Sequence, residues 1–215
     1  MRRKPFRPAG ALTLAAGLVG WSAFVGPRLS PRWQVPIHTL LAAALVRLTR
    51  APLGLRQPEL GRGLRLGLAV AAAVSAGVAT TTAVPRVRGG MLARELPDPA
   101  AWLLVRIPVG TVWSEEAAFR AALGTMAADA FGPRAGRVVQ SAAFGLSHVA
   151  DARRTGEPVL GTVLVTGAAG WALDWLYARS GSLAASMLAH LAINEAGAVA
   201  ALAVQGRFTR RARPS

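Results

Sequence analysis

The sequence contains no cysteine and few acidic residues. Without cysteine the chain can form no disulfide, no thiolate metal site and no cysteine nucleophile. Charged residues make up only 16% of its 215 residues, well below the roughly 25% of a soluble domain. Hydrophobic residues make up 53%, and the mean hydropathy is +0.37. This composition is typical of a membrane protein, and the length allows one compact bundle without a large soluble domain.

Acidic residues are outnumbered by basic ones, 10 Asp and Glu against 25 Lys and Arg, which gives a net charge of +15. A soluble protein this basic would suggest nucleic-acid binding, but no aromatic-basic RNA-binding module is present, so we expect no nucleic-acid partner. The arginines cluster between apolar runs and at both ends of the chain, which is typical of loops held at anionic lipid headgroups.

The basic N-terminus Met1–Lys4 precedes the uncharged run Pro8–Gly26. A signal peptide would have the same order of features. The run is long for a signal peptide, and no clear cleavage site leads into a soluble domain. We therefore predict a retained first membrane helix with a cytoplasmic N-terminus.

Seven segments are candidates for membrane helices, which need about 20 apolar residues each. We predict an all-α fold, a polytopic transmembrane bundle of six to eight helices. An even number would place both basic ends in the cytoplasm. The regular apolar segments are Pro8–Gly26, Leu66–Val84, Pro158–Ala178 and Ser182–Gln205, and the less regular ones are Gln34–Val46, Ala100–Ala128 and Pro133–Ala150.

Glu115 and Glu116 stand side by side in an apolar stretch, and Arg120 follows at helical spacing. Ionisable groups at bilayer depth usually face a bundle interior and mark function. Glu116 and Arg120 share one helix face, where an ion pair would keep the carboxylate ionised. Glu115 points about 100° away, and burial without that partner would raise its proton affinity towards that of a general base. The alternative is a salt-bridged helix end with both carboxylates solvated.

Two later segments each carry a lone histidine. His148 follows Phe144 by four residues, so the two rings share a helix face; the alternative is an interfacial hydrogen-bonding residue. His190 and Asn194 have the same spacing in mid-span, which suits two groups that converge on a metal or on a developing oxyanion. The alternative is a polar clamp between helices. Together with the carboxylates, these residues predict one polar site inside the bundle.

The three motifs Glu-Glu-x-x-x-Arg, Phe-x-x-x-His and His-x-x-x-Asn follow one another on consecutive apolar segments between about Trp102 and Ala200. In this order the chain resembles the CPBP family of intramembrane proteases, which includes the CAAX prenyl endopeptidases and the Abi proteins. The resemblance implies an all-α membrane endopeptidase. Its catalytic core would be residues 100–205, after N-terminal membrane helices with basic loops in 1–99 and before a basic tail in 206–215.

The resemblance also implies roles for the motif residues. Glu115 would activate a water that attacks the scissile carbonyl. Three residues would orient the water or stabilise the oxyanion: His148, His190 and Asn194. Three others would support the site: Glu116, Arg120 and Phe144.

The resemblance leaves the cofactor open. Glu115, His148 and His190 could hold a divalent metal such as zinc with one open position. No His-Glu-x-x-His motif is present, and a glutamate-activated water without metal fits the same residues. The expected partners are the lipid bilayer and a peptide or membrane-protein substrate, in a bacterial plasma membrane.

Two other classes of function remain open on the sequence. One is a non-catalytic membrane scaffold or a bacteriocin self-immunity factor, whose polar groups would serve helix packing. The other is a small transporter in which Glu115 and the histidines form a proton relay.

Overall fold

The computed structural model describes residues 6–206, and within them the chain is all-helical. The all-α prediction is therefore confirmed. The basic stretch Met1–Lys4 and nearly all of the basic tail in 206–215 lie outside the described residues, so the predictions for them remain untested.

Four helical stretches are long and apolar enough to cross a membrane. They correspond to the four regular apolar segments of the sequence, and they make the chain a multi-pass membrane protein. They are Pro8–Arg28, which comprises α1 (Pro8–Gly20) and the turns that continue it, α3 (Glu59–Thr82), α9 (Val159–Ser180) and α10 (Leu183–Val204).

The less regular segments are also helical but do not meet those criteria of length and composition. The segment around the two glutamates is one continuous helical stretch, residues 99–131, which we call the site helix. The other elements are α2 (Pro31–Thr49), α4 (Pro85–Ala93), α7 (Pro133–Ser147) and α8 (Val149–Thr155). Helix α2 extends the predicted segment Gln34–Val46 at both ends, α7 and α8 divide the segment Pro133–Ala150, and α4 forms between two predicted segments.

The site helix has clear start and stop signals. Its first turn is capped by the Asp98 carboxylate, which accepts from the backbone N–H groups of Ala100 and Ala101. Gly132 ends the helix with a φ of 82°, a backbone conformation that favours glycine. Within the helix, Trp102–Trp113 and Glu116–Leu123 are π-helical, a geometry that is frequent at functional sites.

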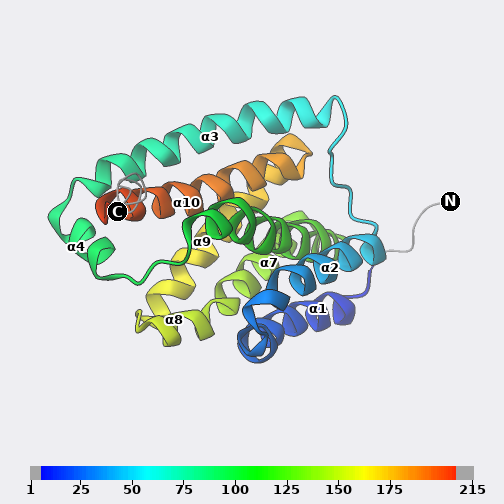
Figure 1. The fold of residues 1–215 in the computed structure, drawn as a ribbon. Coiled ribbons are helices and arrows are strands. Elements are labelled where there is room, and N and C mark those ends of the chain that lie inside the picture. The colour runs from blue at the N-terminus through cyan, green and yellow to red at the C-terminus, as the bar shows by residue number, and fades with distance from the viewer. Residues whose placement is uncertain (1–5, 207–215) are drawn as a thin grey trace.

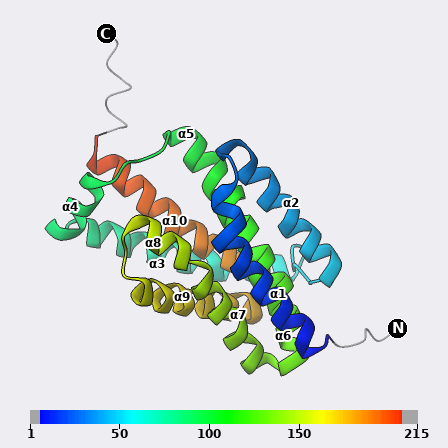
Figure 2. The ribbon, with the colours of Figure 1, turned by 90° about the horizontal axis from the view of Figure 1, so that it is seen from below.

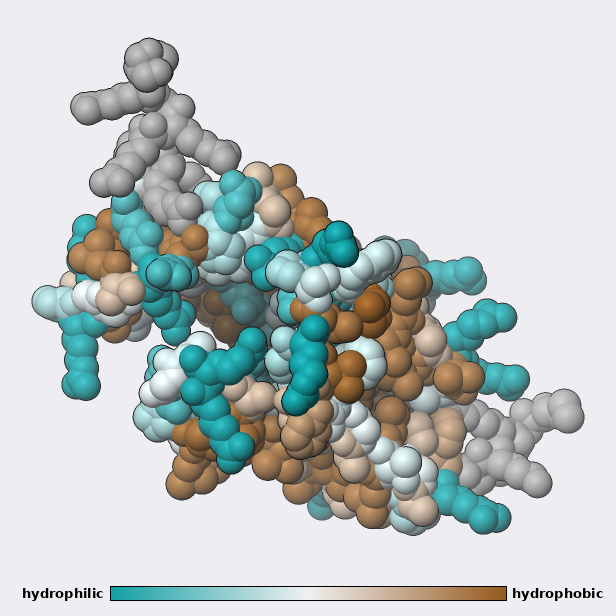
Figure 3. All heavy atoms as spheres, turned by 60° about the horizontal axis from the view of Figure 1, so that its bottom comes forward, coloured by the Kyte–Doolittle hydropathy of each residue, from teal (hydrophilic) through white to brown (hydrophobic). Residues whose placement is uncertain are grey.

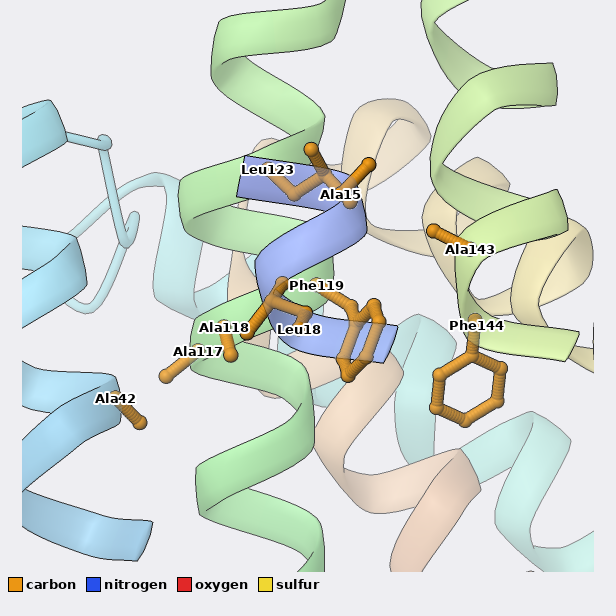
Figure 4. Packing of buried hydrophobic residues seen from close by; sticks show 9 residues of the cluster. All are labelled: Ala15, Leu18, Ala42, Ala117, Ala118, Phe119, Leu123, Ala143 and Phe144. Atoms are coloured by element: carbon orange, nitrogen blue, oxygen red, sulfur yellow. The ribbon is translucent and has the colours of Figure 1, made fainter. Parts of the chain in front are cut away.

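The site helix lies at the centre of the bundle. It is contacted by α1, α2, α7, α9 and α10, and in Figures 1 and 2 these helices surround it. Every residue from Glu116 to Leu123 is buried. Figure 4 shows how Phe119 and Leu123 of this helix meet Leu18 of α1 and Phe144 of α7 among small alanines.

The distribution of polar and apolar side chains is the reverse of that in a soluble protein. Many large apolar side chains are exposed, including Leu40, Leu48 and Leu164, whereas Glu116 and Arg120 are fully buried. Apolar side chains cover much of the face drawn in Figure 3, and hydrophilic ones lie along its borders and around a hollow. Such a surface fits contact with lipid chains.

Helices α3 and α10 run along each other at short range (Figure 1). A Cβ added at Gly67 of α3 would lie 2.9 Å from the Ala185 Cα of α10, and one added at Gly63 would lie 2.6 Å from the Ser182 Cβ. The two glycines form a G-x-x-x-G pattern that lets membrane helices approach closely. The contact anchors the N-terminal half of the chain to α10, which carries His190.

We expect Gly67→Ala to lower the thermal unfolding temperature of the purified protein in detergent. The added methyl group meets backbone atoms of Ala185 that cannot turn aside, and such overpacking costs about 1–3 kcal/mol. Gly77→Ala is the matched control, because a Cβ at Gly77 of the same helix meets nothing within 4 Å. Equal unfolding temperatures for the two variants would contradict the close approach of α3 and α10.

Candidate active site

The two neighbouring carboxylates of the site helix face different surroundings. Glu115 lies at the junction of the two π-helical segments, and its side chain is 30% exposed. The Glu116 side chain is fully buried. Adjacent residues on a helix point about 100° apart, so one carboxylate reaches an open space while the other enters the protein interior. The divergence predicted from the sequence is therefore present in the structure.

Glu116 is held by partners from two helices. Its Oε1 accepts a hydrogen bond from His190 Nδ1 of α10 at 2.8 Å and lies 3.3 Å from Arg120 Nη1. The Arg120 guanidinium carbon lies 3.7 Å from the centre of the Phe144 ring, so the cation is enclosed between a carboxylate and an aromatic face. Glu116 thus fixes the orientation of both Arg120 and His190.

His190 is placed between the two carboxylates. Its Nδ1 donates to Glu116 at 2.8 Å, and its other ring nitrogen, Nε2, lies 3.8 Å from Glu115 Oε2. In the neutral imidazole with the proton on Nδ1, Nε2 is an acceptor. In catalytic sites, a carboxylate that accepts a hydrogen bond from one ring nitrogen of a histidine often sets the tautomer of that histidine.

His148 stands where α7 ends and α8 begins. Its Nδ1 lies 2.8 Å from the Phe144 carbonyl oxygen, which can only accept, so Nδ1 donates. Its ring packs edge-on against the Phe144 ring with centroids 4.8 Å apart, and the same Phe144 ring is 6.2 Å from that of His190. Phe144 therefore contacts both imidazoles and separates them. That Phe144 supports His148 in the reaction remains a prediction.

Asn194 occupies a less direct position. Its Nδ2 donates to the backbone carbonyl oxygen of His190, one turn earlier on α10, at 3.1 Å. Neither Asn194 nor His190 is among the residues that line the cavity in front of Glu115. The structure thus places Glu115 3.8 Å from His190 and in the same cavity as His148, and it leaves the Asn194 amide bound to the backbone of its own helix.

A cavity of about 370 Å³ opens in front of Glu115. Its walls come from the site helix, from the junction of α7 and α8, from the start of α2 and from the turn after α1. A smaller cavity of about 90 Å³ adjoins it and also contains Glu115. The polar or aromatic residues of the larger cavity include Trp21, Ser22, Gln34, His38, Arg106, Glu115, Ser147, His148, Asp151 and Arg154.

Sequence reasoning missed His38 and Trp21, which line both cavities together with Glu115. His38 could have been found by the criterion that singled out the other histidines, since it is an ionisable group in an apolar segment. His38 was missed because its segment, Gln34–Val46, is one of the less regular ones and because it belongs to none of the three motifs. Trp21 gave no signal beyond an aromatic residue near the end of an apolar run.

The candidate metal ligands do not form a metal site in this arrangement. Within residues 6–206, no three His, Cys, Asp or Glu side chains are placed so that they could hold an ion together. The geometry therefore does not fit the Glu115, His148 and His190 ligand set, and we derive no step through a metal.

Comparison with known proteins gives one match. The profile of the type II CAAX prenyl endopeptidase Rce1-like family matches residues 97–196. The matched region begins just before the site helix and ends within α10, so it contains every predicted site residue. No curated protein and no solved structure matches the chain. The predicted resemblance is confirmed for this region: residues 97–196 form a domain similar to the type II CAAX prenyl endopeptidase Rce1-like family.

Proposed function

We propose that the protein is an intramembrane endopeptidase that hydrolyses a peptide bond of a membrane-associated protein or peptide. One observation carries the proposal. The Glu115 carboxylate faces a polar cavity inside a membrane helix bundle, with imidazoles from two other helices beside it. Glu115 Oε2 is buried and has no hydrogen-bond partner among the described residues, so this oxygen is available to a water in the cavity.

The reaction follows from this geometry. Glu115 takes a proton from the water as the water oxygen bonds to the scissile carbonyl carbon. The C–N bond then breaks, and the nitrogen leaves as an amine with the proton that Glu115 held. General-base catalysis of this kind contributes about 10²–10⁴-fold to the rate. In the neutral tautomer with the proton on Nδ1, His190 Nε2 is an acceptor, so it can accept a hydrogen bond from the second O–H of the water.

His148 is suited to the carbonyl oxygen of the substrate. Because its Nδ1 is bound to the Phe144 carbonyl, only Nε2 remains for the cavity. In the imidazolium form, with both ring nitrogens protonated, Nε2 would donate to the oxyanion of the tetrahedral intermediate, an interaction worth about 10²–10³-fold. The buried Glu116 and Arg120 pair would support the helix that carries the base.

The function is tested by a cleavage assay on the purified protein with a peptide library, with and without a chelator. Cleavage by the wild type that is lost when Glu115 is replaced supports the endopeptidase. Activity that is unchanged by a chelator supports a water activated by glutamate alone. Proton-coupled flux in liposomes without cleavage would instead support a transporter. Whether the bilayer is a bacterial plasma membrane remains a prediction.

We expect Asn194→Ala to reduce kcat less than His190→Ala does. Within residues 6–206 the Asn194 amide donates to a backbone carbonyl of its own helix, whereas His190 lies between both carboxylates. The measurement is kcat for both variants on the same peptide. If the loss on Asn194→Ala matches that on His190→Ala, the Asn194 amide must turn towards the substrate, as the family resemblance implies.

A further inference from the structure

His38 lies in the part of the chain that the family profile does not cover. It is on α2, and the match begins at residue 97. Nevertheless His38 lines both cavities that contain Glu115. The N-terminal helices thus supply a titratable side chain to the same space as the motif residues.

One ring nitrogen of His38 has no hydrogen-bond partner within the described residues. Its Nε2 is buried and makes no hydrogen bond to any residue in 6–206, and the same holds for Trp21 Nε1. The two rings meet edge to face with centroids 6.0 Å apart. Leaving a buried polar group without a partner is unfavourable. Because His38 and Trp21 each have such a group and line the same cavities, we expect these nitrogens to bind water or substrate in the cavity.

Glu115 lines the same two cavities. Its Oε2 is also buried and unpartnered within the described part of the chain. Glu115 therefore has His190 of α10 at 3.8 Å and shares its cavities with His38 of α2. The smaller cavity, about 90 Å³, has room for a few waters at roughly 30 Å³ each.

We propose that His38 is a catalytic residue of this site, which binds through Nε2 the water that Glu115 deprotonates. The inference rests on the proposed endopeptidase function. The water donates one hydrogen to Glu115 Oε2 and the other to His190 Nε2. Its oxygen accepts from His38 Nε2–H, and the remaining lone pair attacks the scissile carbonyl. Four directions around the oxygen are then occupied by three residues and the substrate.

His38 keeps its proton throughout this step. The proton that leaves the water goes to Glu115 and then to the departing amine, so the balance of the reaction is unchanged. His38 fixes where the water oxygen stands and which lone pair faces the substrate. Such positioning acts on the chemical step more than on substrate binding.

The alternative is that His38 only fills space against Trp21. The two cases are separated by His38→Phe, which keeps an aromatic ring but has no nitrogen. With the peptide that the wild-type protein cleaves, we expect His38→Phe to lower kcat about 100-fold and to change KM by less than about threefold. His38→Gln, which keeps an N–H donor, is expected to recover at least about tenfold of that loss.

Thr39→Val is the matched control. Thr39 is next to His38, and its Oγ1 is also buried without a hydrogen-bond partner among residues 6–206, but it lines neither cavity. We expect wild-type kcat for this variant. If His38→Phe fails to fold, His38→Leu and His38→Gln are compared at equal thermal stability, and the proposal requires His38→Gln to be the faster by about tenfold or more.

The results also separate this inference from the proposed function. Full activity of His38→Phe, or equal rates of His38→Leu and His38→Gln, overturns the role of His38 while loss of activity in Glu115→Gln still supports the endopeptidase. Full activity of Glu115→Gln overturns both. Loss of kcat in His38→Phe with unchanged KM, partial recovery in His38→Gln and wild-type behaviour of Thr39→Val support the assignment.

Discussion

Glu115→Gln is expected to lower kcat for peptide cleavage by about 10³-fold or more while the fold is kept. The glutamine has the same size but cannot take the proton from the water, so the general-base contribution of about 10²–10⁴-fold is lost. Glu115 Oε2 has no hydrogen-bond partner among the described residues, so the substitution breaks no hydrogen bond of this oxygen. Cleavage rate, helicity and thermal unfolding are measured on the same preparation.

The control for this variant is Glu95→Gln. Glu95 is an exposed carboxylate ahead of the site helix, and it lines neither of the cavities that contain Glu115. We expect its cleavage rate and unfolding temperature to equal those of the wild type. A Glu115→Gln variant that retains more than a tenth of wild-type kcat would show that another group activates the water. The scaffold and immunity hypotheses would then become the better explanations of the buried charges.

Hydropathy predicted the four clear spans but not all of their limits. Helix α3 was expected from Leu66 to Val84 and begins instead at Glu59. Its first turn is polar, and Arg62 bonds to Glu59 within that turn and to the backbone of Ser180. Such contacts stabilise a helix end without apolar residues. A search for apolar runs cannot detect them.

Helix α7 shows the opposite limit of sequence reasoning. The segment Pro133–Ala150 was expected as one helix, but α7 ends at Ser147 and α8 starts at Val149. His148 lies at the break with a ψ of −1°, and its side chain bonds to the Phe144 carbonyl oxygen. This local hydrogen bond competes with continuation of the helix. The spacing of Phe144 and His148 predicted their contact but not the break.

The motif residues could be brought together from the sequence because each motif is local. A spacing of four residues places Glu116 beside Arg120 on one helix, and the structure has this contact. The approach of His190 to Glu116 depends on the docking of α10 against the site helix, for which the sequence offered only the family resemblance. The position of His38 at the cavity depends on how α1 and α2 pack against the site helix, and none of the three motifs lies in α1 or α2. The site was therefore predictable on the side of the motifs and unpredictable on the N-terminal side.

The second large effect concerns stability. We expect Glu116→Gln and Arg120→Met each to lower the free energy of unfolding by about 3–5 kcal/mol, because each leaves an uncompensated charge in a fully buried site. Glu59→Gln is the matched control. Glu59 also pairs with an arginine on a helix, but the Arg62 and Glu59 side chains are 47% and 38% exposed, so the expected loss is below about 1 kcal/mol. Thermal unfolding in detergent measures all three.

The double variant Glu116→Gln with Arg120→Met distinguishes a charge pair from two independent contacts. When both charges are removed, neither is left buried alone, so the double variant should be less destabilised than the sum of the single ones by about 1–3 kcal/mol. Strict additivity would mean that Glu116 acts through His190 and that Arg120 acts through the Phe144 ring, each without the other. In that case the Arg120 cation would be stabilised by the aromatic face, 3.7 Å away, and Glu116 would serve the orientation of His190 alone. The comparison of the double variant with the two single variants thus decides whether Arg120 stabilises the site helix independently or acts by holding the Glu116 carboxylate that binds His190.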